Sequence, residues 1–274
     1  MRRPYALLIA LILIVSLAAC TSTPEPPVVD APPVATNPSQ VPSEEPTLND
    51  APIPMTYAEF LAAPLNSKVT VDTCIQDVEE WRDGTLRLYT QNDEGAYYID
   101  SLVCTEGEAW GTLNPGAKIR VTGQKSTANG QIKITDATFV LLENVNDANF
   151  AAPVDVTALA RQGDNALIEK MNHWVFFKGL TVIPSIDAEG HEVPFLYKQD
   201  GSGSQGDDIC FRASIGEQTY TFLVNTSMVG TGPQSEQYEA IEKNLQIGDV
   251  ITIECYLCWN DGPQPHVTAV YPTN

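Results

Sequence analysis

The stretch Leu113-Asn-Pro-Gly-Ala-Lys-Ile-Arg-Val-Thr-Gly123 decides the fold, because its pattern recurs as Leu245-Gln-Ile-Gly-Asp-Val-Ile-Thr-Ile-Glu-Cys255. Each copy is a leucine, a glycine-containing turn and an alternating segment that is typical of a strand. In both copies a second turn follows, an Asn-Gly ending at Gly130 or an Asp-Gly ending at Gly262. Such dipeptides favour a hairpin. The sequence therefore predicts two copies of one β-rich unit.

The first unit has the element order of an OB-fold, a five-stranded, partly open Greek-key barrel. Alternating segments and turn dipeptides predict three strands, one short helix and two further strands. The strands are expected over 68–77, 85–91, 96–101, 118–125 and 131–142, with the helix over 106–111.

The second unit repeats this order. Strands are expected over 174–183, over 195–199 together with 208–213, and over 218–225, followed by a helix near 236–244 and a hairpin; a helix over 155–170 leads in. The expected fold class is mainly β, with two tandem five-stranded OB-fold-like barrels, each with a short helix between strands three and four. The expected domains are 55–145 and 146–274.

The first 20 residues predict export and lipid attachment. Arg2 and Arg3 precede a short apolar run that ends in Leu17-Ala-Ala-Cys20, which is typical of a secretory signal segment and matches the lipobox of bacterial lipoproteins. The match implies a signal peptide over 1–19 and a diacylated (palmitate-bearing) Cys20; an ordinary signal peptide with a chance cysteine is the alternative. Since two acyl chains anchor stably, we expect a lipid-anchored protein on the extracytoplasmic face of the cell membrane.

A Pro-rich acidic linker is expected over 20–54. Residues 21–54 contain 10 of the 20 prolines and no Lys, Arg or aromatic residue. Such a segment cannot bury enough apolar surface to fold and is expected to be disordered. At about 3.1 Å per residue it could lift the folded part roughly 100 Å from a membrane.

Three segments of the folded part resemble a known group. Pro115–Gly123, the opening Met55–Phe60 and the ending Pro265–Thr268 are similar to tandem OB-fold lipoproteins of Gram-positive, often anaerobic gut bacteria. The resemblance covers most of residues 55–274 and consists of turns and strands without a catalytic signature. It implies the fold and the location, and no activity.

Five cysteines follow the lipid-attachment position. Cys255-Tyr-Leu-Cys258 spells C-x-x-C, but residues three apart in a strand point to opposite faces, which disfavours a shared metal or a redox pair. Cys74 could meet Cys104, and Cys210 could meet Cys255, across each barrel, and export permits disulfides. Buried small hydrophobes are the alternative.

No motif predicts an enzyme. Gly201-Ser-Gly-Ser-Gln-Gly206 matches G-x-G-x-x-G, but acids and a strand follow it where a dinucleotide site needs a helix. Asp200, Asp207 and Asp208 lack the alternation of a calcium loop. The three histidines are scattered, and there is no G-x-S-x-G. We therefore expect a non-catalytic protein with no catalytic residue, no cofactor and no metal.

We expect a ligand to bind on the outer face of strands two and three and on the loops joining strands one-two and four-five, where OB-folds bind ligands. Large aromatic residues at loop tips can stack on sugars, bases or peptide side chains; the alternative is that they cover a barrel end as core. The candidate ligand-binding residues are Trp81, Arg82, Arg87, Tyr89, Tyr98 and Trp259.

Charge sets the expected partners. The net charge is -20; residues 55–145 hold 13 acids against seven Lys and Arg, and residues 150–274 hold 16 against six. Binding to nucleic acid needs a positive footprint on phosphates. We therefore expect a surface-anchored binding or adaptor lipoprotein that contacts the membrane through Cys20 and takes a glycan, peptide or protein ligand. The alternatives are an exported OB-fold nucleic-acid-binding protein, which the charge disfavours, and a hydrolase whose site the sequence does not reveal.

Overall fold

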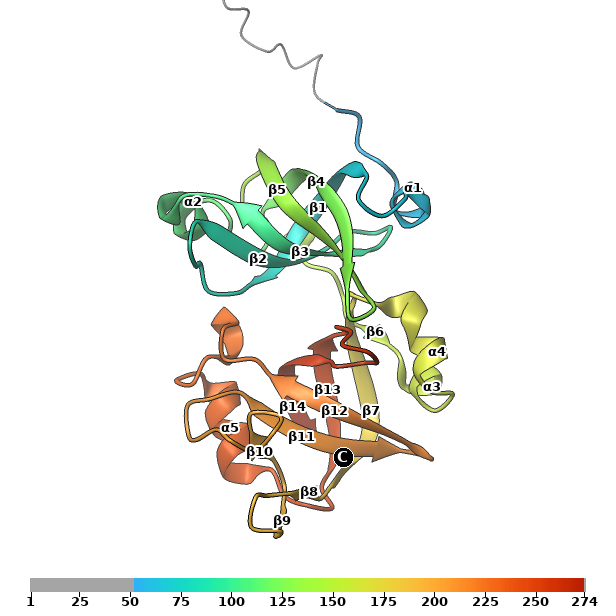
Figure 1. The fold of residues 1–274 in the computed structure, drawn as a ribbon, viewed down its shortest axis with the longest axis vertical. Helices are drawn as coiled ribbons and strands as arrows, with labels where there is room; N and C mark the ends of the chain where they lie inside the picture. The colour runs from blue at the N-terminus through green and yellow to red at the C-terminus, as the bar shows by residue number, and fades with distance from the viewer. Residues whose placement is uncertain (1–51, 274) are drawn as a thin grey trace, which may run out of the picture. The chain divides into compact units, whose positions relative to one another are not determined.

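Five strands of the N-terminal half close into a barrel, in a computed structural model that describes residues 52–273 (Figure 1). The hydrogen-bonded order is β1-β2-β3-β5-β4, and β1 pairs antiparallel with both β2 and β4. Its elements are β1 (Lys68–Val78), β2 (Thr85–Gln91), β3 (Ala96–Val103), α2 (Glu106–Gly111), β4 (Lys118–Ala128) and β5 (Gln131–Glu143). This first barrel confirms the predicted OB-fold-like order for residues 55–145.

A helix that the sequence analysis did not predict packs against the first barrel. α1 (Tyr57–Ala62) begins with a capping box, in which Thr56 and Glu59 each accept a hydrogen bond from the other's backbone N–H. Its buried residue, Phe60, meets the ring of Tyr97 edge-on, with 5.0 Å between the ring centroids. The helix therefore adds to the core of the barrel.

Lys125 of β4 closes the C-terminal end of this helix. Its buried ammonium group donates to the carbonyl oxygens of Phe60, Leu61 and Ala63 at 2.9, 2.8 and 2.7 Å. The last carbonyls of a helix have no partner within the helix, so one lysine satisfies three acceptors and fixes α1 to β4.

The C-terminal half forms a second sheet, with the order β10-β11-β12-β14-β13-β7-β6. β11 also pairs with β7, so the pairings lead from β7 through β11, β12, β14 and β13 back to β7. The strands of this sheet are β6 (Val154–Asp155), β7 (Trp174–Ile183), β10 (Leu196–Tyr197), β11 (Ile209–Ile215), β12 (Gln218–Val224), β13 (Val250–Tyr256) and β14 (His266–Pro272), and β8 (Ser185–Ile186) pairs with β9 (Glu192–Val193) in a separate two-stranded sheet. The helices are α3 (Thr157–Ala160), α4 (Asp164–Leu167), α5 (Glu236–Asn244) and the 3-10 turns η2 (Asp147–Asn149), η3 (Ile168–Lys170) and η4 (Val229–Thr231).

Two predictions for this half need correction. The helix expected over 155–170 is interrupted, because Gly163 adopts a φ of 98° between α3 and α4. The second strand was expected to combine 195–199 with 208–213, but β10 pairs with β11, with Leu196 opposite Cys210. The two segments are therefore neighbouring strands.

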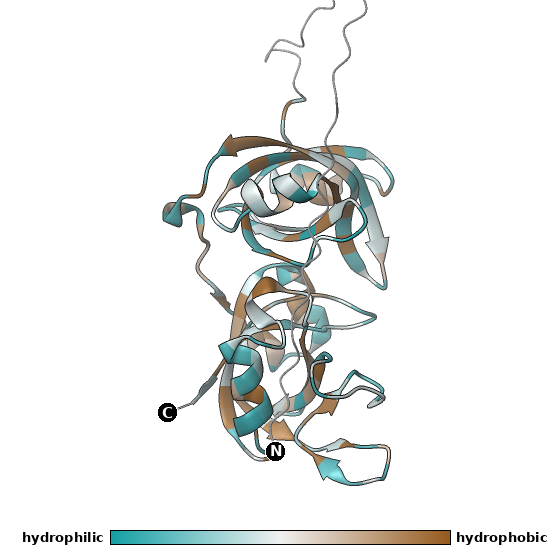
Figure 2. Cartoon of the chain, turned by 90° about the vertical axis from the view of Figure 1, so that its left-hand side faces the viewer, coloured by the Kyte–Doolittle hydropathy of each residue, from teal (hydrophilic) through white to brown (hydrophobic). Residues whose placement is uncertain are grey.

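A small cluster of buried side chains joins the first barrel to the second sheet. Tyr89 and Tyr98 of the barrel pack against Met228, Tyr256 and Cys258 of the C-terminal half. The described residues belong to one compact unit, and Figure 2 shows hydrophobic residues concentrated along the strands of both halves. The boundary that the sequence analysis placed between 145 and 146 stays a prediction.

The segment 144–154, which follows β5, lies against the first barrel. The Gln76 side chain donates to the Asn149 carbonyl at 3.0 Å and accepts from the Ala151 backbone N–H at 2.9 Å. The predicted signal peptide, Cys20 and nearly all of the predicted linker lie outside the described residues. No helix within 52–273 is long and apolar enough to cross a membrane.

The Lys125 contacts predict a large effect of one substitution. Lys125→Met keeps the aliphatic stem but leaves the Leu61 and Ala63 carbonyls without their donor and the Phe60 carbonyl with the Ala63 backbone N–H alone, so we expect a loss of about 2 to 4 kcal/mol of unfolding free energy. Urea unfolding measures it. The control is Lys68→Met on the exposed start of β1, which should stay within about 0.5 kcal/mol of the wild type. Equal effects of the two substitutions would contradict the role of Lys125.

Candidate functional site

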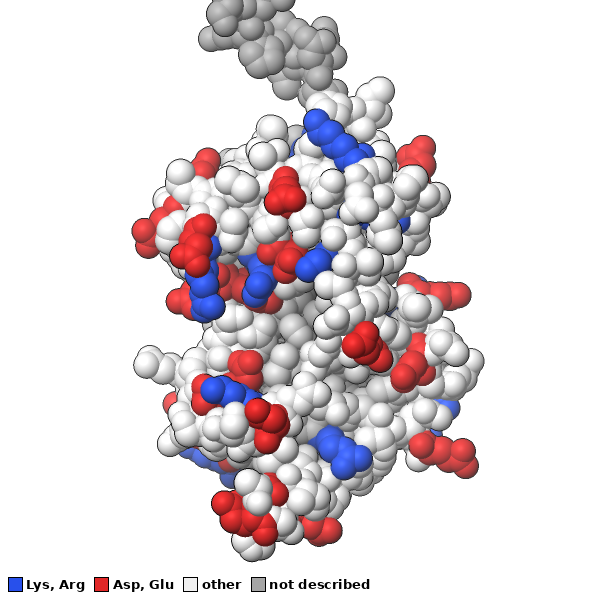
Figure 3. Space-filling view, in the orientation of Figure 1, with Lys and Arg blue, Asp and Glu red and all other residues white. Residues whose placement is uncertain are grey.

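A cleft of about 310 Å³ opens where the end of β1, the β1–β2 loop, β2 and β3 meet the segment before η4. All but one of its lining residues come from the first barrel, and Figure 3 shows basic and acidic residues interleaved over this part of the molecule. The lining residues are Glu79, Glu80, Arg82, Asp83, Thr85, Arg87, Asp100, Ser101 and Ser227.

The turn that carries Arg82 forms as its sequence predicts. Asp83 and Gly84 adopt φ values of 51° and 82°, and Arg82 and Thr85 exchange two backbone hydrogen bonds of 3.0 Å. Two residues with positive φ are characteristic of a tight hairpin turn, for which Asp-Gly is a favoured pair. The turn places the Arg82 side chain at the rim of the cleft.

Two guanidinium groups of the cleft are accessible. The Arg82 side chain is 74% exposed, and its one ion pair within residues 52–273 is with Glu80, at 3.4 Å; such an exposed pair is weak. The Arg87 side chain is 54% exposed and meets Glu79 at 3.3 Å and Asp100 at 3.2 Å. Each guanidinium therefore keeps N–H donors that can reach an anion in the cleft.

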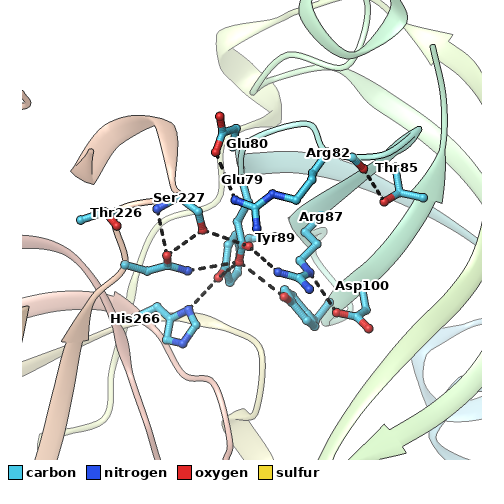
Figure 4. A network of polar contacts seen from close by, with 12 residues as sticks. Glu79, Glu80, Arg82, Thr85, Arg87, Tyr89, Asp100, Thr226, Ser227 and His266 are labelled. Carbon is cyan, nitrogen blue, oxygen red and sulfur yellow. Dashed lines mark hydrogen bonds and ion pairs between the residues drawn. The ribbon is translucent and has the colours of Figure 1, made fainter. Parts of the chain in front are cut away.

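The floor of the cleft holds a buried carboxylate, that of Glu79, which is 3% exposed. It accepts from Tyr89 Oη at 2.7 Å and from Asn225 Nδ2 at 3.4 Å, and Ser227 Oγ, whose one hydrogen is shared with Asn225 Oδ1 at 2.7 Å, lies at 3.2 Å (Figure 4). Tyr98 Oη lies at 3.4 Å. Burying a charge is costly unless it is hydrogen-bonded, and these donors from both halves of the chain meet that need.

Tyr89 connects this carboxylate to the second sheet. Its one hydroxyl hydrogen is donated to Glu79, so the 2.7 Å contact with His266 requires His266 Nδ1 to be the donor. Burial lowers the pKa of His266, which favours the neutral ring, and the contact with Tyr89 then selects the tautomer that is protonated at Nδ1. The ring of Tyr89 also stacks on Tyr256, with 4.4 Å between the centroids.

Three of the predicted ligand-binding aromatic residues lie between the two halves. Tyr89 and Tyr98 are 1% and 9% exposed, because the C-terminal half covers the outer face of β2 and β3. Trp259 is half-buried against the core of the second sheet and against Gly130 of the β4–β5 hairpin. A Cβ at Gly130 would approach Trp259 Cδ1 to 2.8 Å.

Trp81 covers the first barrel. Its indole N–H donates to the Cys104 carbonyl at 3.2 Å, and its ring packs against the barrel core. This is the arrangement that the sequence analysis named as the alternative to a free stacking platform. Of the six predicted residues, Arg82 and Arg87 present the most accessible polar groups; their role in binding a ligand stays a prediction.

Sequence reasoning missed the residues that hold the floor together. It gave no role to Glu79, which is buried, and it found no partner for His266. Glu79 and Ser227 are 148 residues apart, so no local pattern could pair them. The Asp-Gly turn was the one local signal that pointed to this cleft.

All five cysteines of the described region are free and buried, so neither proposed disulfide forms. Burial raises the pKa of the Cys210 thiol to about 11 and also raises that of Cys258, which makes both poor nucleophiles. One surface group, Asp187, Glu189 and His191, brings possible metal-ligand atoms within 4.8 Å of one another. It lies in the β8–β9 turn.

No protein-family model matches the chain, and no curated protein matches it. Three solved structures align with most of it. The p204 HINb domain is 9% identical, with a TM-score of 0.32, over 77% of this chain and 99% of that one. A murine DNA binding protein bound with ds DNA is 11% identical, with a TM-score of 0.31, over 75% and 96%. A Replication Protein A heterotrimer bound to ssDNA is 8% identical, with a TM-score of 0.28, over 76% and 49%.

These comparisons contradict two expectations. Two of the three structures hold DNA, so the expectation that nucleic acid is an unlikely partner is wrong, and the preference for an adaptor that takes a glycan, peptide or protein ligand is not retained. That expectation rested on the net charge of the chain and of each unit, and neither value describes a cleft. TM-scores of 0.28 to 0.32 reflect a loose match, so where a ligand binds depends on this chain's own residues.

The burial of Asp77, two residues before Glu79, predicts that the unfolding free energy of the protein depends on pH. Burial raises the pKa of Asp77 to about 6. A carboxyl whose pKa is raised on folding stabilises the protein below its unfolded pKa, and that stability is lost as the pH rises through about 6. Asp77→Asn should therefore raise the unfolding free energy at pH 8 by about 2 to 3 kcal/mol, with little effect at pH 4.

Thermal or urea unfolding at the two pH values measures the difference. In the wild type the backbone N–H of Val78 donates to Asp77 Oδ1 at 2.8 Å. In the Asp77→Asn variant the side-chain amide oxygen can accept this hydrogen bond instead. Asp83→Asn in the exposed turn is the control and should change neither value. An Asp77→Asn effect of the same size at pH 4 and pH 8 would contradict the burial argument.

Proposed function

We propose that this protein binds single-stranded nucleic acid through the cleft at Arg82 and Arg87. The observation that supports the proposal is the presence of two accessible guanidinium groups at one cleft, on the β1–β2 loop and the outer face of β2, where OB-folds bind strands. A guanidinium presents a fork of N–H donors that matches the oxygens of a phosphate. Each arginine can therefore hold one phosphate of a strand.

The size of the cleft favours a single strand over a duplex. A volume of about 310 Å³ is at the small end of the range for ligand sites, about 300 to 1,000 Å³. It has room for one nucleotide that leaves the strand, but not for paired bases. Thr85 and Ser101 line the cleft with hydroxyl groups, which can exchange hydrogen bonds with a sugar or a base edge.

The acidic character of the chain determines how the proposed strand binds. A net charge of -20 repels a polyanion at long range, and Glu80, Asp83 and Asp100 stand beside the two arginines. Binding therefore depends on a few short-range contacts and not on a broad positive field. We expect modest affinity, best seen at low salt, with a salt dependence that corresponds to few phosphates.

Three further proposals extend the sequence analysis. In the second sheet the strand pairings lead from β7 through β11, β12, β14 and β13 back to β7. This closed path supports a second OB-fold-like barrel, with α5 between its third and fourth strands. The lack of a catalytic motif supports a non-enzymatic role. Leu17-Ala-Ala-Cys20 supports a lipid anchor that holds the protein on the extracytoplasmic face of the membrane, and the mass of the processed N-terminal peptide tests it.

Substitution of the two arginines tests the proposed function. With a labelled oligonucleotide in anisotropy titrations at low salt, Arg82→Gln and Arg87→Gln should each weaken binding about tenfold, because each removes one charged hydrogen-bonding partner of a phosphate. Each should also reduce the slope of log K against log salt by about 0.7.

Arg161→Gln is the matched control, since Arg161 is an exposed arginine at the end of α3, away from the cleft lining. Melting temperatures identify any variant that fails to fold. A wild-type protein that binds no single strand at low salt, or an Arg82→Gln variant that binds as tightly as Arg161→Gln, would overturn the proposal.

A further inference from the structure

The outer face of β11 and β12 is open, whereas the matching face of the first barrel is covered. In the first barrel, the outward-facing Tyr89 and Tyr98 are buried by the C-terminal half. On β11 and β12 the outward-facing side chains from the Arg212–Thr221 pair to the β11–β12 turn are polar and exposed or half-exposed, whereas the next outward pair, Cys210 and Leu223, is buried and half-buried. We call this surface the Arg212 face, and its residues are Thr181, Arg212, Ser214, Thr219 and Thr221.

Strand register places these side chains on one side of the sheet. Arg212 lies opposite Thr221 and Ser214 lies opposite Thr219 across the β11–β12 pair, and Ser214 lies opposite Thr181 across the β11–β7 pair. Successive side chains of a strand point to opposite faces. The alternate residues, such as Phe211, Ala213 and Phe222, are fully buried in the core, so the polar set points outward.

The charge of this face differs from that of the cleft. Arg212 Nη1 donates to the Pro184 carbonyl at 3.3 Å. Within the described part of the chain, no carboxylate lies within 4.0 Å of its guanidinium group, whereas Arg82 and Arg120 each have one and Arg87 has two. The face itself carries no acid; Glu217 lies beyond its edge, in the β11–β12 turn.

We infer that the Arg212 face is a second contact for a phosphate of the strand. This inference rests on the proposed function. The phosphate would accept hydrogen bonds from the Arg212 guanidinium and from the hydroxyl of Thr221, which lies opposite Arg212 across the strand pair and is a donor that carries no opposing charge. The N-terminal cleft and the C-terminal face would then each hold part of one strand, and neither half would supply the full affinity.

The alternative is that Arg212 only covers the sheet with its aliphatic stem. The two roles differ in what they change: a covering residue affects stability, and a phosphate contact affects binding and its salt dependence. Because Arg212 is exposed, replacing it with glutamine should leave the melting temperature nearly unchanged.

The experiment compares Arg212→Gln, Arg82→Gln and Arg161→Gln in the full chain, with a labelled oligothymidylate of about 20 nucleotides, longer than the site of one OB-fold. Arg212→Gln should weaken binding about five- to tenfold relative to Arg161→Gln and reduce the salt slope by about 0.7. Arg212→Lys, which keeps the charge, should recover part of the affinity.

The outcomes separate the two proposals. If Arg212→Gln binds like Arg161→Gln while Arg82→Gln binds weakly, the Arg212 contact is wrong and the proposed function stands. If Arg212→Gln lowers the melting temperature and Arg212→Lys recovers stability without affinity, the covering role replaces the proposal. If the wild-type protein binds no strand, the proposed function itself is wrong.

Discussion

The buried carboxylate of Glu79 is the interaction on which the arrangement of the described chain depends. A charge that is 3% exposed needs several donors, and here they come from both halves: Tyr89 and Arg87 from the first barrel, and Asn225 and Ser227 from the segment before η4. Removing one partner of a buried charge costs more than the bond itself, because the charge is left unpaired. The network therefore favours one relative position of the barrel and the second sheet.

The same contact decides which surfaces remain for a ligand. The C-terminal half that covers Glu79 also covers Tyr89 and Tyr98. The aromatic face of the first barrel is therefore buried in the interface between the two halves. Polar groups at the rim, above all Arg82 and Arg87, are what the first barrel keeps in contact with solvent. The proposed strand would thus meet arginines and hydroxyls in the cleft, with stacking on exposed aromatic residues contributing little.

Local signals predicted most of the fold. Asp83-Gly84 and the alternation of Thr85–Gln91 fixed a turn and a strand correctly, because both depend only on neighbouring residues. The capping box of Thr56 and Glu59 is equally local, so α1 could have been found. The contacts of Glu79 could not be predicted from the sequence, because its partner Ser227 lies 148 residues away. The burial of Tyr89 and Tyr98 could not be predicted either, because an outward-facing tyrosine gives a strand the same sequence pattern whether solvent or the other half of the chain covers it.

The most direct measurement of the central claim is a double-mutant cycle between Glu79→Gln and Ser227→Ala, by urea unfolding of the full chain. The two residues belong to different halves and meet at 3.2 Å. The account predicts a coupling energy of about 1 kcal/mol or more, because the destabilisations caused by substitutions within one hydrogen-bond network do not add. Destabilisations that simply add within about 0.3 kcal/mol would contradict the claim that Glu79 joins the two halves.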